Sequence, residues 1–195
     1  MNKLPKLSFL ASHGGSSARQ IINALQQHTL KAELGTIISN NSDSAIVHWC
    51  NEQQLPIQVV NRKTCPDPAD EDAAILSLLQ AAATDWVILS GYMKKIGANT
   101  LSHYADRILN IHPALLPKHG GQGKYGDYVH AAVLDAGEKV SGATVHLVND
   151  RYDEGPILKQ AQVPVLIDDT VASLRARVQS IEAPLYIAAI QELLG

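Results

Sequence analysis

The sequence predicts an α/β fold in which a doubly wound, mostly parallel sheet is followed by a C-terminal strand pair and a helix. Short apolar runs alternate with longer segments of helical periodicity over about the first 110 residues, which is the pattern of parallel βαβ units. The run at residues 86–89 is continuously apolar, as expected of a strand buried on both faces. Beyond residue 118 the alternation ceases, and two strand-like segments precede one long amphipathic helix.

Five apolar segments in the first part of the chain have the length and composition of strands. They are residues 7–11, 34–38, 56–60, 86–89 and 107–111. The intervening segments carry apolar residues at helical spacing, such as Ile21, Ile22 and Leu25. They predict helices over residues 16–30, 43–53 and 100–104, together with one that carries Ile75, Leu78 and Leu79 and follows a polar, proline-bearing loop at residues 61–70.

The remainder of the chain predicts a different arrangement. Four glycines within residues 118–128 indicate a long flexible loop, and Gly137 is a plausible end for a short helix over residues 131–136. Two strands, 144–148 and 159–165, are separated by a turn at residues 152–156. The last helix spans residues 170–194, with Asp169 or Thr170 as its cap.

The bulk composition is that of an ordinary globular protein, with 46% hydrophobic and 18% charged residues and a net charge of −3. This balance favours neither a nucleic-acid nor a membrane partner. No apolar run approaches the ~18–20 residues of a membrane span, and the N-terminus lacks the features of a signal peptide. We therefore expect a cytoplasmic protein whose two cysteines, Cys50 and Cys65, are unlinked thiols.

The most informative stretch is Asn110-Ile111-His112-Pro113, at the end of a predicted strand. Side chains two residues apart on a strand point to the same face, so Asn110 and His112 should project together. A carboxamide can donate a hydrogen bond to a carbonyl oxygen, and an imidazole can move a proton near neutral pH. Ligands of doubly wound sheets bind beyond the carboxyl ends of strands, so this pair suits acyl transfer.

Two other segments are weaker candidates. The loop before the first helix contains Gly15, Ser16 and Ser17; glycine, hydroxyl groups and a helix N-terminus suit a phosphate monoester, although a capped glycine turn has the same pattern. Asp153 lies in a turn with Gly155, where aspartate is common for local reasons, so it gains a chemical role only if it lies beside His112.

A metal site is the alternative that the eight histidines raise. The plausible ligands are His112, His119, His130 and His146. Because no HExxH pattern or tight histidine pair with a carboxylate partner is present, we expect no metal.

The segments that carry these residues resemble the formyltransferase family that uses formyl-tetrahydrofolate. Within it, the Leu-Leu-Pro-Lys sequence after His112-Pro113 is more similar to the purine-pathway branch, the glycinamide ribonucleotide transformylases, than to the tRNA or sugar formyltransferases. The resemblance covers nearly the whole chain, and its separated segments occur in the family's order. They are residues 13–17, 91–93, 110–118, 142–156 and 175–182.

The resemblance implies a single Rossmann-like formyltransferase domain over residues 1–195, with a nucleotide- and phosphate-binding half at about 1–105 and a folate and catalytic half at about 106–195. It implies that the amine of glycinamide ribonucleotide attacks the formyl carbon of 10-formyltetrahydrofolate, in de novo purine biosynthesis and without a metal. Asn110 would polarise the formyl oxygen and His112 would act as general acid. Asp153 would keep the pKa of His112 raised and relay protons through water.

The resemblance also implies three binding segments. Gly15, Ser16 and Ser17 match the phosphate loop, and Glu182 matches a residue that contacts the glycinamide end of the substrate. The folate pocket would be lined by Met93, Lys94, Lys95 and Ile96, together with Asn110.

The chain departs from the family pattern in three places. The phosphate loop has His13 where glycine is common and Ser17 where asparagine is common. Pro68 stands where an arginine often meets the folate glutamate tail, and Arg62 or Lys63 are its possible substitutes. The loop at residues 120–128 is longer than in well-known members, and it is either a lid that excludes water or a passive excursion.

Two other functions remain open. With water or an amino sugar as acceptor, the same site would make a formyltetrahydrofolate hydrolase or a sugar N-formyltransferase. Without catalysis, the fold would be a folate- or nucleotide-binding module, which the presence of Asn110, His112 and Asp153 disfavours. We expect a monomer or a homodimer.

Overall fold

The structure, a computed structural model, describes residues 3–195 and confirms the α/β architecture. Its strands follow the order β3-β2-β1-β4-β5-β6-β7 in one sheet. The chain divides into two compact units, the first ending at Leu109 and the second comprising residues 110–193. Each unit is described by itself.

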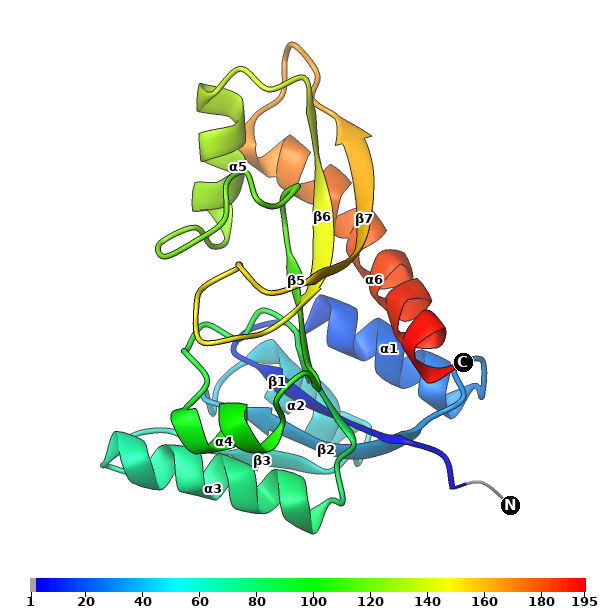
Figure 1. The fold of residues 1–195 in the computed structure, drawn as a ribbon, viewed down its shortest axis with the longest axis vertical. Helices are drawn as coiled ribbons and strands as arrows, with labels where there is room; N and C mark the ends of the chain where they lie inside the picture. Colours follow the sequence, from blue (N-terminus) through cyan, green and yellow to red (C-terminus); the bar gives the residue numbers. More distant parts are fainter. Residues whose placement is uncertain (1–2) are drawn as a thin grey trace. The chain divides into compact units, whose positions relative to one another are not determined.

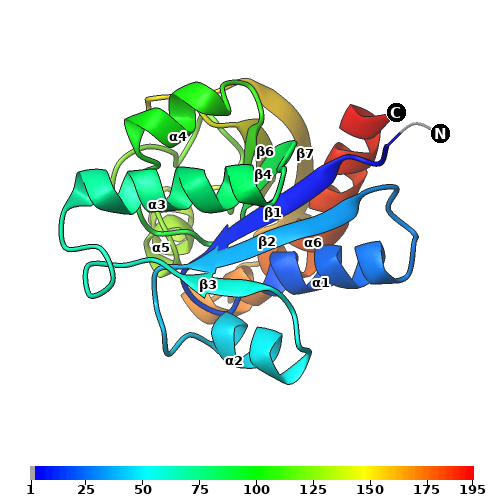
Figure 2. The same cartoon turned by 90° about the horizontal axis from the view of Figure 1, so that it is seen from below.

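The first unit is a parallel sheet with helices on both faces. β1 pairs in parallel with β2 and β4, and β2 pairs in parallel with β3. Figures 1 and 2 show α1 and α2 on one face of these strands and α3 with α4 on the other. The strands are β1 (Lys6–Ala11), β2 (Glu33–Ser39), β3 (Ile57–Val59) and β4 (Trp86–Leu89). The helices are α1 (Ser16–Gln26), α2 (Ala45–Glu52), α3 (Pro68–Ala81) and α4 (Ala98–His103).

The core of this unit lies along β1. Phe9 is fully buried and pairs with Ile37 of β2 and Ile88 of β4, which are also fully buried. A strand that is covered on both faces has no solvent-facing side, which explains why β1 is mostly apolar rather than alternating and why its polar residue Ser8 is buried.

The second unit is built on an antiparallel strand pair. β6 (Val140–Leu147) pairs with β7 (Ile157–Pro164), with Ala143 opposite Ala161. β5 (Ile108–His112) leads into this unit from the first. The pair is accompanied by α5 (Asp127–Asp135) and by the long helix α6 (Val171–Leu194), which runs along β7 in Figure 1.

Several predicted boundaries need correction. The first helix ends at Gln26 rather than at residue 30, because the chain turns at His28, which has a positive φ of 56°. The loop predicted to extend to residue 70 ends at Asp67, whose side chain caps α3 by accepting from the Ala69 N–H (2.8 Å).

In the second unit, α5 begins at Asp127 rather than at residue 131, and β6 begins at Val140 rather than at residue 144. The helix cap at Thr170 is confirmed: its side chain accepts from the Ser173 N–H, and the Ser173 hydroxyl accepts from the Thr170 N–H. Among residues 3–195, no helix is long and apolar enough to cross a membrane.

Candidate active site

β5 ends at the two residues that the sequence singles out. Asn110 and His112 lie two residues apart on the strand, so their side chains point to the same face. Asn110 is half-buried, and His112 is only 3% exposed. The strand stops before Pro113, and the chain beyond it is held by Thr144 of β6. The Thr144 hydroxyl donates to the carbonyl of Ala114 (2.7 Å) and accepts from the N–H of Leu116 (3.0 Å). These bonds fix the direction in which the chain leaves β5.

Asp153 lies beside His112, which was the condition for giving it a chemical role. It sits in the turn between β6 and β7 with a positive φ of 58°, and its Oδ2 is 3.4 Å from Nδ1 of His112. The same oxygen accepts from the Gly121 N–H (2.9 Å). Burial would raise the pKa of Asp153, but His146, His112 and this N–H outweigh burial and hold the pKa below its ordinary value.

His146 joins the two predicted residues, although the sequence suggested it only as a metal ligand. Its Nδ1–H donates to the carbonyl of Leu147 (2.9 Å), which leaves Nε2 to accept from the carboxamide of Asn110 (3.1 Å). Nε2 of His146 is also 3.6 Å from Oδ1 of Asp153. The structure therefore brings Asn110, His112 and Asp153 together in one bonded group. With His146 we call this group the catalytic cluster, after the role that the family resemblance implies for it.

Each ring nitrogen of His112 faces an oxygen acceptor. Nε2–H donates to the carbonyl of His119 (2.9 Å), and Nδ1 faces Asp153. Both acceptors favour the protonated ring. Burial has the larger effect, however, and lowers the pKa of His112 below its ordinary value. The expectation of a raised pKa is therefore wrong for this structure, although Asp153 acts in the expected direction.

The glycine-rich loop, which begins after Lys118, contacts the catalytic cluster at its start. His119 supplies the carbonyl that His112 binds, and Gly121 supplies the N–H that Asp153 binds. Glu138 holds the beginning of the loop, with its carboxylate 3.3 Å from the His119 ring and 3.0 Å from the ammonium of Lys118. The first residues of the loop are thus part of the environment of His112 and Asp153.

The phosphate-loop residues lie in the first unit, at the start of α1. Gly15 is the N-cap and has a positive φ of 57°. A side chain there would also meet Ile46, because an added Cβ would lie 2.8 Å from its Cδ1. The first turn of α1 contains no acidic residue, and Ser16 is exposed while Ser17 is buried. A helix N-terminus without acidic side chains is electrostatically suited to an anion.

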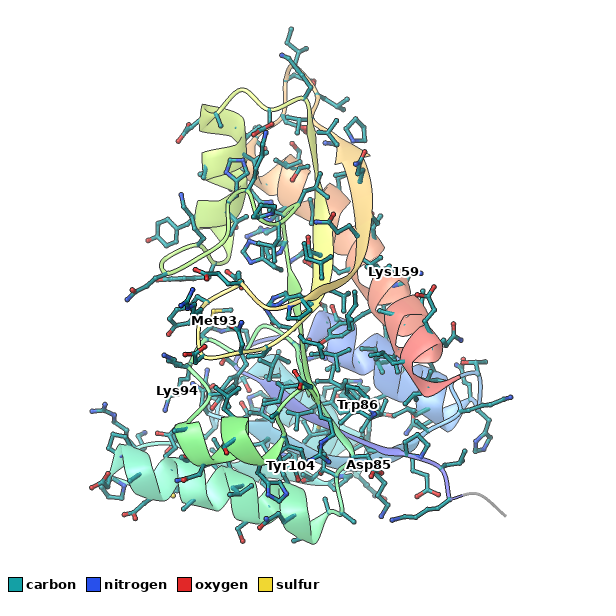
Figure 3. All side chains as sticks on the ribbon, in the orientation of Figure 1. Asp85, Trp86, Met93, Lys94, Tyr104 and Lys159 are labelled. Carbon is teal, nitrogen blue, oxygen red and sulfur yellow. The ribbon has the colours of Figure 1, made fainter. Side chains whose placement is uncertain are left out.

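The predicted folate-lining residues also lie in the first unit, in the irregular stretch between β4 and α4. Met93 is 44% exposed and Ile96 is 8% exposed. Lys94 forms an ion pair with Glu71 of α3. Figure 3 shows the side chains of Met93 and Lys94 on this stretch. Pro68, which stands where the family often has an arginine for the folate glutamate tail, is the first residue of α3.

Two remaining predictions concern Glu182 and a metal. Glu182 is half-buried on α6. Within the part of the chain that the structure describes, no three His, Cys, Asp or Glu side chains are arranged to hold a metal ion. Of the four candidate ligands, His112, His119 and His146 take part in or adjoin the catalytic cluster, whereas His130 is buried on α5.

Comparisons with a family model and with known proteins point to the same family. The formyl transferase family model matches residues 5–190. A phosphoribosylglycinamide formyltransferase from Haemophilus influenzae is 34% identical over 94% of this chain and 84% of its own length. The chloroplastic phosphoribosylglycinamide formyltransferase of Arabidopsis thaliana is 36% identical over 95% of this chain, which spans 64% of that protein's length.

A solved structure agrees with the sequence matches. Glycinamide ribonucleotide transformylase 1 from Symbiobacterium toebii superposes with a TM-score of 0.92 at 32% identity, covering 100% of this chain and 89% of that one. The match of a family model over residues 5–190 and of relatives above 30% identity leaves one conclusion: this chain belongs to the formyltransferase family.

Proposed function

We propose that this chain is an enzyme that transfers the formyl group of 10-formyltetrahydrofolate to the amine of glycinamide ribonucleotide, in de novo purine biosynthesis. The observation that carries the proposal is the bonded group of Asn110, His112, Asp153 and His146 around the end of β5. It supplies a hydrogen-bond donor, a titratable ring and a carboxylate, which formyl transfer requires, and the reaction needs no serine or cysteine nucleophile. The amine of the substrate is the nucleophile.

In this proposal Asn110 binds the formyl oxygen. Its carboxamide has two N–H groups, and one is directed to Nε2 of His146 (3.1 Å). The other is available to the formyl oxygen, on which negative charge develops as the amine adds to the carbon. Loss of one such oriented donor typically costs about 3 kcal/mol of transition-state stabilisation.

His112 and Asp153 manage the protons of the reaction. The bond from the amine nitrogen to the formyl carbon forms while the carbonyl becomes an oxyanion. Its collapse breaks the bond to N10 of the folate, which takes up a proton. The amine loses one proton, which Asp153 accepts by way of water. Negative charge beside the His112 ring favours its protonation, so a ring that is neutral at rest takes this proton from Asp153 as the oxyanion forms. The ring gives the same proton to N10 on collapse, which returns His112 and Asp153 to their starting states.

Binding of the two substrates is assigned residue by residue. We assign the phosphate to Gly15, Ser16 and Ser17, supported by the N-terminus of α1. Glu182 is assigned to the glycinamide end. The folate pocket is assigned to Met93, Lys94, Lys95 and Ile96, with Asn110.

The experiment that tests this function is an absorbance assay of 10-formyltetrahydrofolate consumption, run with and without glycinamide ribonucleotide. We expect consumption that depends on the ribonucleotide and yields its formylated form. Equal consumption without it would identify a hydrolase instead. Absence of consumption in both reactions would contradict formyl transfer to this acceptor and turn attention to amino sugars or to ligand binding alone.

We also propose that the enzyme acts in the cytoplasm. Both cysteines, Cys50 and Cys65, are free thiols, which fits a reducing compartment. The chloroplastic location of the Arabidopsis relative indicates that location varies within the family.

A further inference from the structure

We propose that Glu71, a buried carboxylate on α3, is a positioning residue for the folate-lining stretch at residues 92–96, and that it acts by holding the ammonium group of Lys94. The inference rests on the proposed assignment of residues 93–96 to the folate pocket. It concerns a residue that lies outside every motif by which the family resemblance is carried.

The stretch between β4 and α4 has no regular secondary structure and is held from outside at its beginning. The Ser12 N–H donates to the carbonyl of Gly91 (3.3 Å), and the Ser12 hydroxyl accepts from the Met93 N–H (2.8 Å). Because Ser12 directly follows β1, these two bonds tie the beginning of the stretch to the parallel sheet.

The end of the stretch is held by Asp72 of α3. Its carboxylate accepts from the N–H groups of Asn99 (2.8 Å) and Thr100 (3.1 Å) and from the Thr100 hydroxyl (2.6 Å). The approach is so close that a Cβ added at Gly97 would lie 2.1 Å from Cγ of Asp72. Asp72 therefore caps α4 from a neighbouring helix, a task that Gly97 cannot perform because it has no side chain.

Glu71 holds the middle of the stretch through Lys94. The two side chains form an ion pair in which Glu71 is 10% exposed and Lys94 is 34% exposed. Glu71 lies in the first turn of α3, where the helix dipole favours a negative charge. Burial, Glu71 and Asp72 together raise the pKa of Tyr92, which places that ring in the same acidic environment. Figure 3 shows Lys94 next to Met93, whose backbone Ser12 holds.

A lysine side chain free to rotate would leave the stretch without this tie to α3 at its middle. The ion pair to a buried, helix-borne carboxylate restricts it before ligand arrives, so less conformational entropy is lost on binding. A contact that pre-orders a binding segment and takes no part in bond making contributes equally to ground and transition states. It therefore affects KM and leaves kcat unchanged.

The test is steady-state kinetics of Glu71→Gln, which keeps the volume of the side chain and removes its charge. At saturating glycinamide ribonucleotide, we expect the KM for 10-formyltetrahydrofolate to rise about tenfold with kcat and the KM for the ribonucleotide unchanged. Asp70→Asn, at an exposed carboxylate one residue away on the same helix, is the matched control and should leave all three constants unchanged. If Glu71→Gln is too unstable to assay, Glu71→Leu gives the same test without a buried polar group.

A double-mutant cycle with Lys94→Met tests the role of Glu71 separately from the proposed assignment of residues 93–96 to the folate pocket. We expect the double variant to have the folate KM of Lys94→Met alone, because both changes remove one interaction. An unchanged or lower folate KM in Glu71→Gln, or effects that multiply, would overturn the positioning role. If Lys94→Met and Ile96→Ala both leave the folate KM unchanged, the folate assignment itself is wrong and the inference falls with it.

Discussion

At the residue scale, His112 is the group whose removal should separate binding from turnover. It is buried, and both ring nitrogens are engaged by Asp153 and by the His119 carbonyl. For His112→Ala we expect kcat to fall at least about 100-fold, the usual contribution of a general acid or base, while formyl-folate still quenches protein fluorescence with a similar Kd. His48→Ala, at an exposed histidine of α2, is the control. Near-normal turnover in His112→Ala would contradict the mechanism.

His146 should matter to turnover through the two residues of the catalytic cluster that it contacts. It accepts from the Asn110 carboxamide and lies 3.6 Å from Asp153, so it orients one catalytic group and neighbours another. His146→Leu keeps a similar volume and removes both interactions. We expect kcat to fall about 10- to 100-fold, less than the loss of an oxyanion donor itself, with a shifted pH profile. A kcat equal to that of His48→Leu would show that Asn110 is oriented without it.

The catalytic cluster was partly predictable from the sequence. Asn110 and His112 lie two apart at the end of an apolar run, and strand geometry then requires a common face. Asp153 needed the fold, because no local pattern says which turn lies beside which strand end. His146 alternates with Thr144 along β6, and both are buried. The sequence signal that could have identified His146 was a pair of polar residues two apart on a predicted strand, since buried polar groups need partners.

At the element scale, α4 depends on a side chain that α3 provides. Asp72 is 8% exposed and satisfies the first N–H groups of a six-residue helix. For Asp72→Ala we expect a loss of about 2–3 kcal/mol in the free energy of unfolding, because hydrogen bonds to a buried charge are removed. Urea unfolding followed by circular dichroism measures it. The exposed Asp70→Ala should change it by no more than about 0.5 kcal/mol; equal effects of the two would argue against capping by Asp72.

Element boundaries were the least predictable feature, for local physical reasons. α1 stops at Gln26 although its polar sequence continues, because the chain must turn at His28 to enter β2. α5 begins at Asp127, directly after Gly126 with its positive φ of 52°. A glycine-rich loop gives no apolar periodicity from which that start could be read.

At the scale of the whole molecule, the fold class could be predicted from the alternation of strand-like and helical segments and from the point near residue 118 where this alternation ends. Alternation of strands and helices predicted the parallel sheet, and the C-terminal segments predicted the antiparallel pair that β6 and β7 form. The pKa values of the buried histidines could not be predicted from the sequence in this way. Burial sets the pKa of His112 more strongly than its carboxylate neighbour does, and burial at a given residue emerges only when the whole chain is folded.

Stability should therefore decrease in mild acid because of two buried histidines. Burial lowers the pKa of His112 and of His130 below the ordinary value of 6.5, despite Asp153 near the first and Asp127 near the second. Arg175 and His112 lower the pKa of His130 further. Below pH 6.5 the unfolded chain thus binds protons that the folded chain does not, and the free energy of unfolding falls as pH falls. At pH 7.5 and above, both rings are almost entirely neutral in either state.

The size of this effect can be measured one histidine at a time. Each ring contributes at most about 1.4 kcal/mol per pH unit, within a window between 6.5 and its folded pKa. The carboxyl groups with lowered pKa, such as Asp169 beside Arg177, act in a separate window below their ordinary value of 3.8.

Urea unfolding at pH 7.5, 6.5 and 5.5 should show a smaller decrease in the free energy of unfolding for His130→Gln than for the wild type, because glutamine does not titrate. His48→Gln should retain the full decrease. An identical decrease in His130→Gln would mean that the buried ring of α5 takes up its proton without cost to the fold.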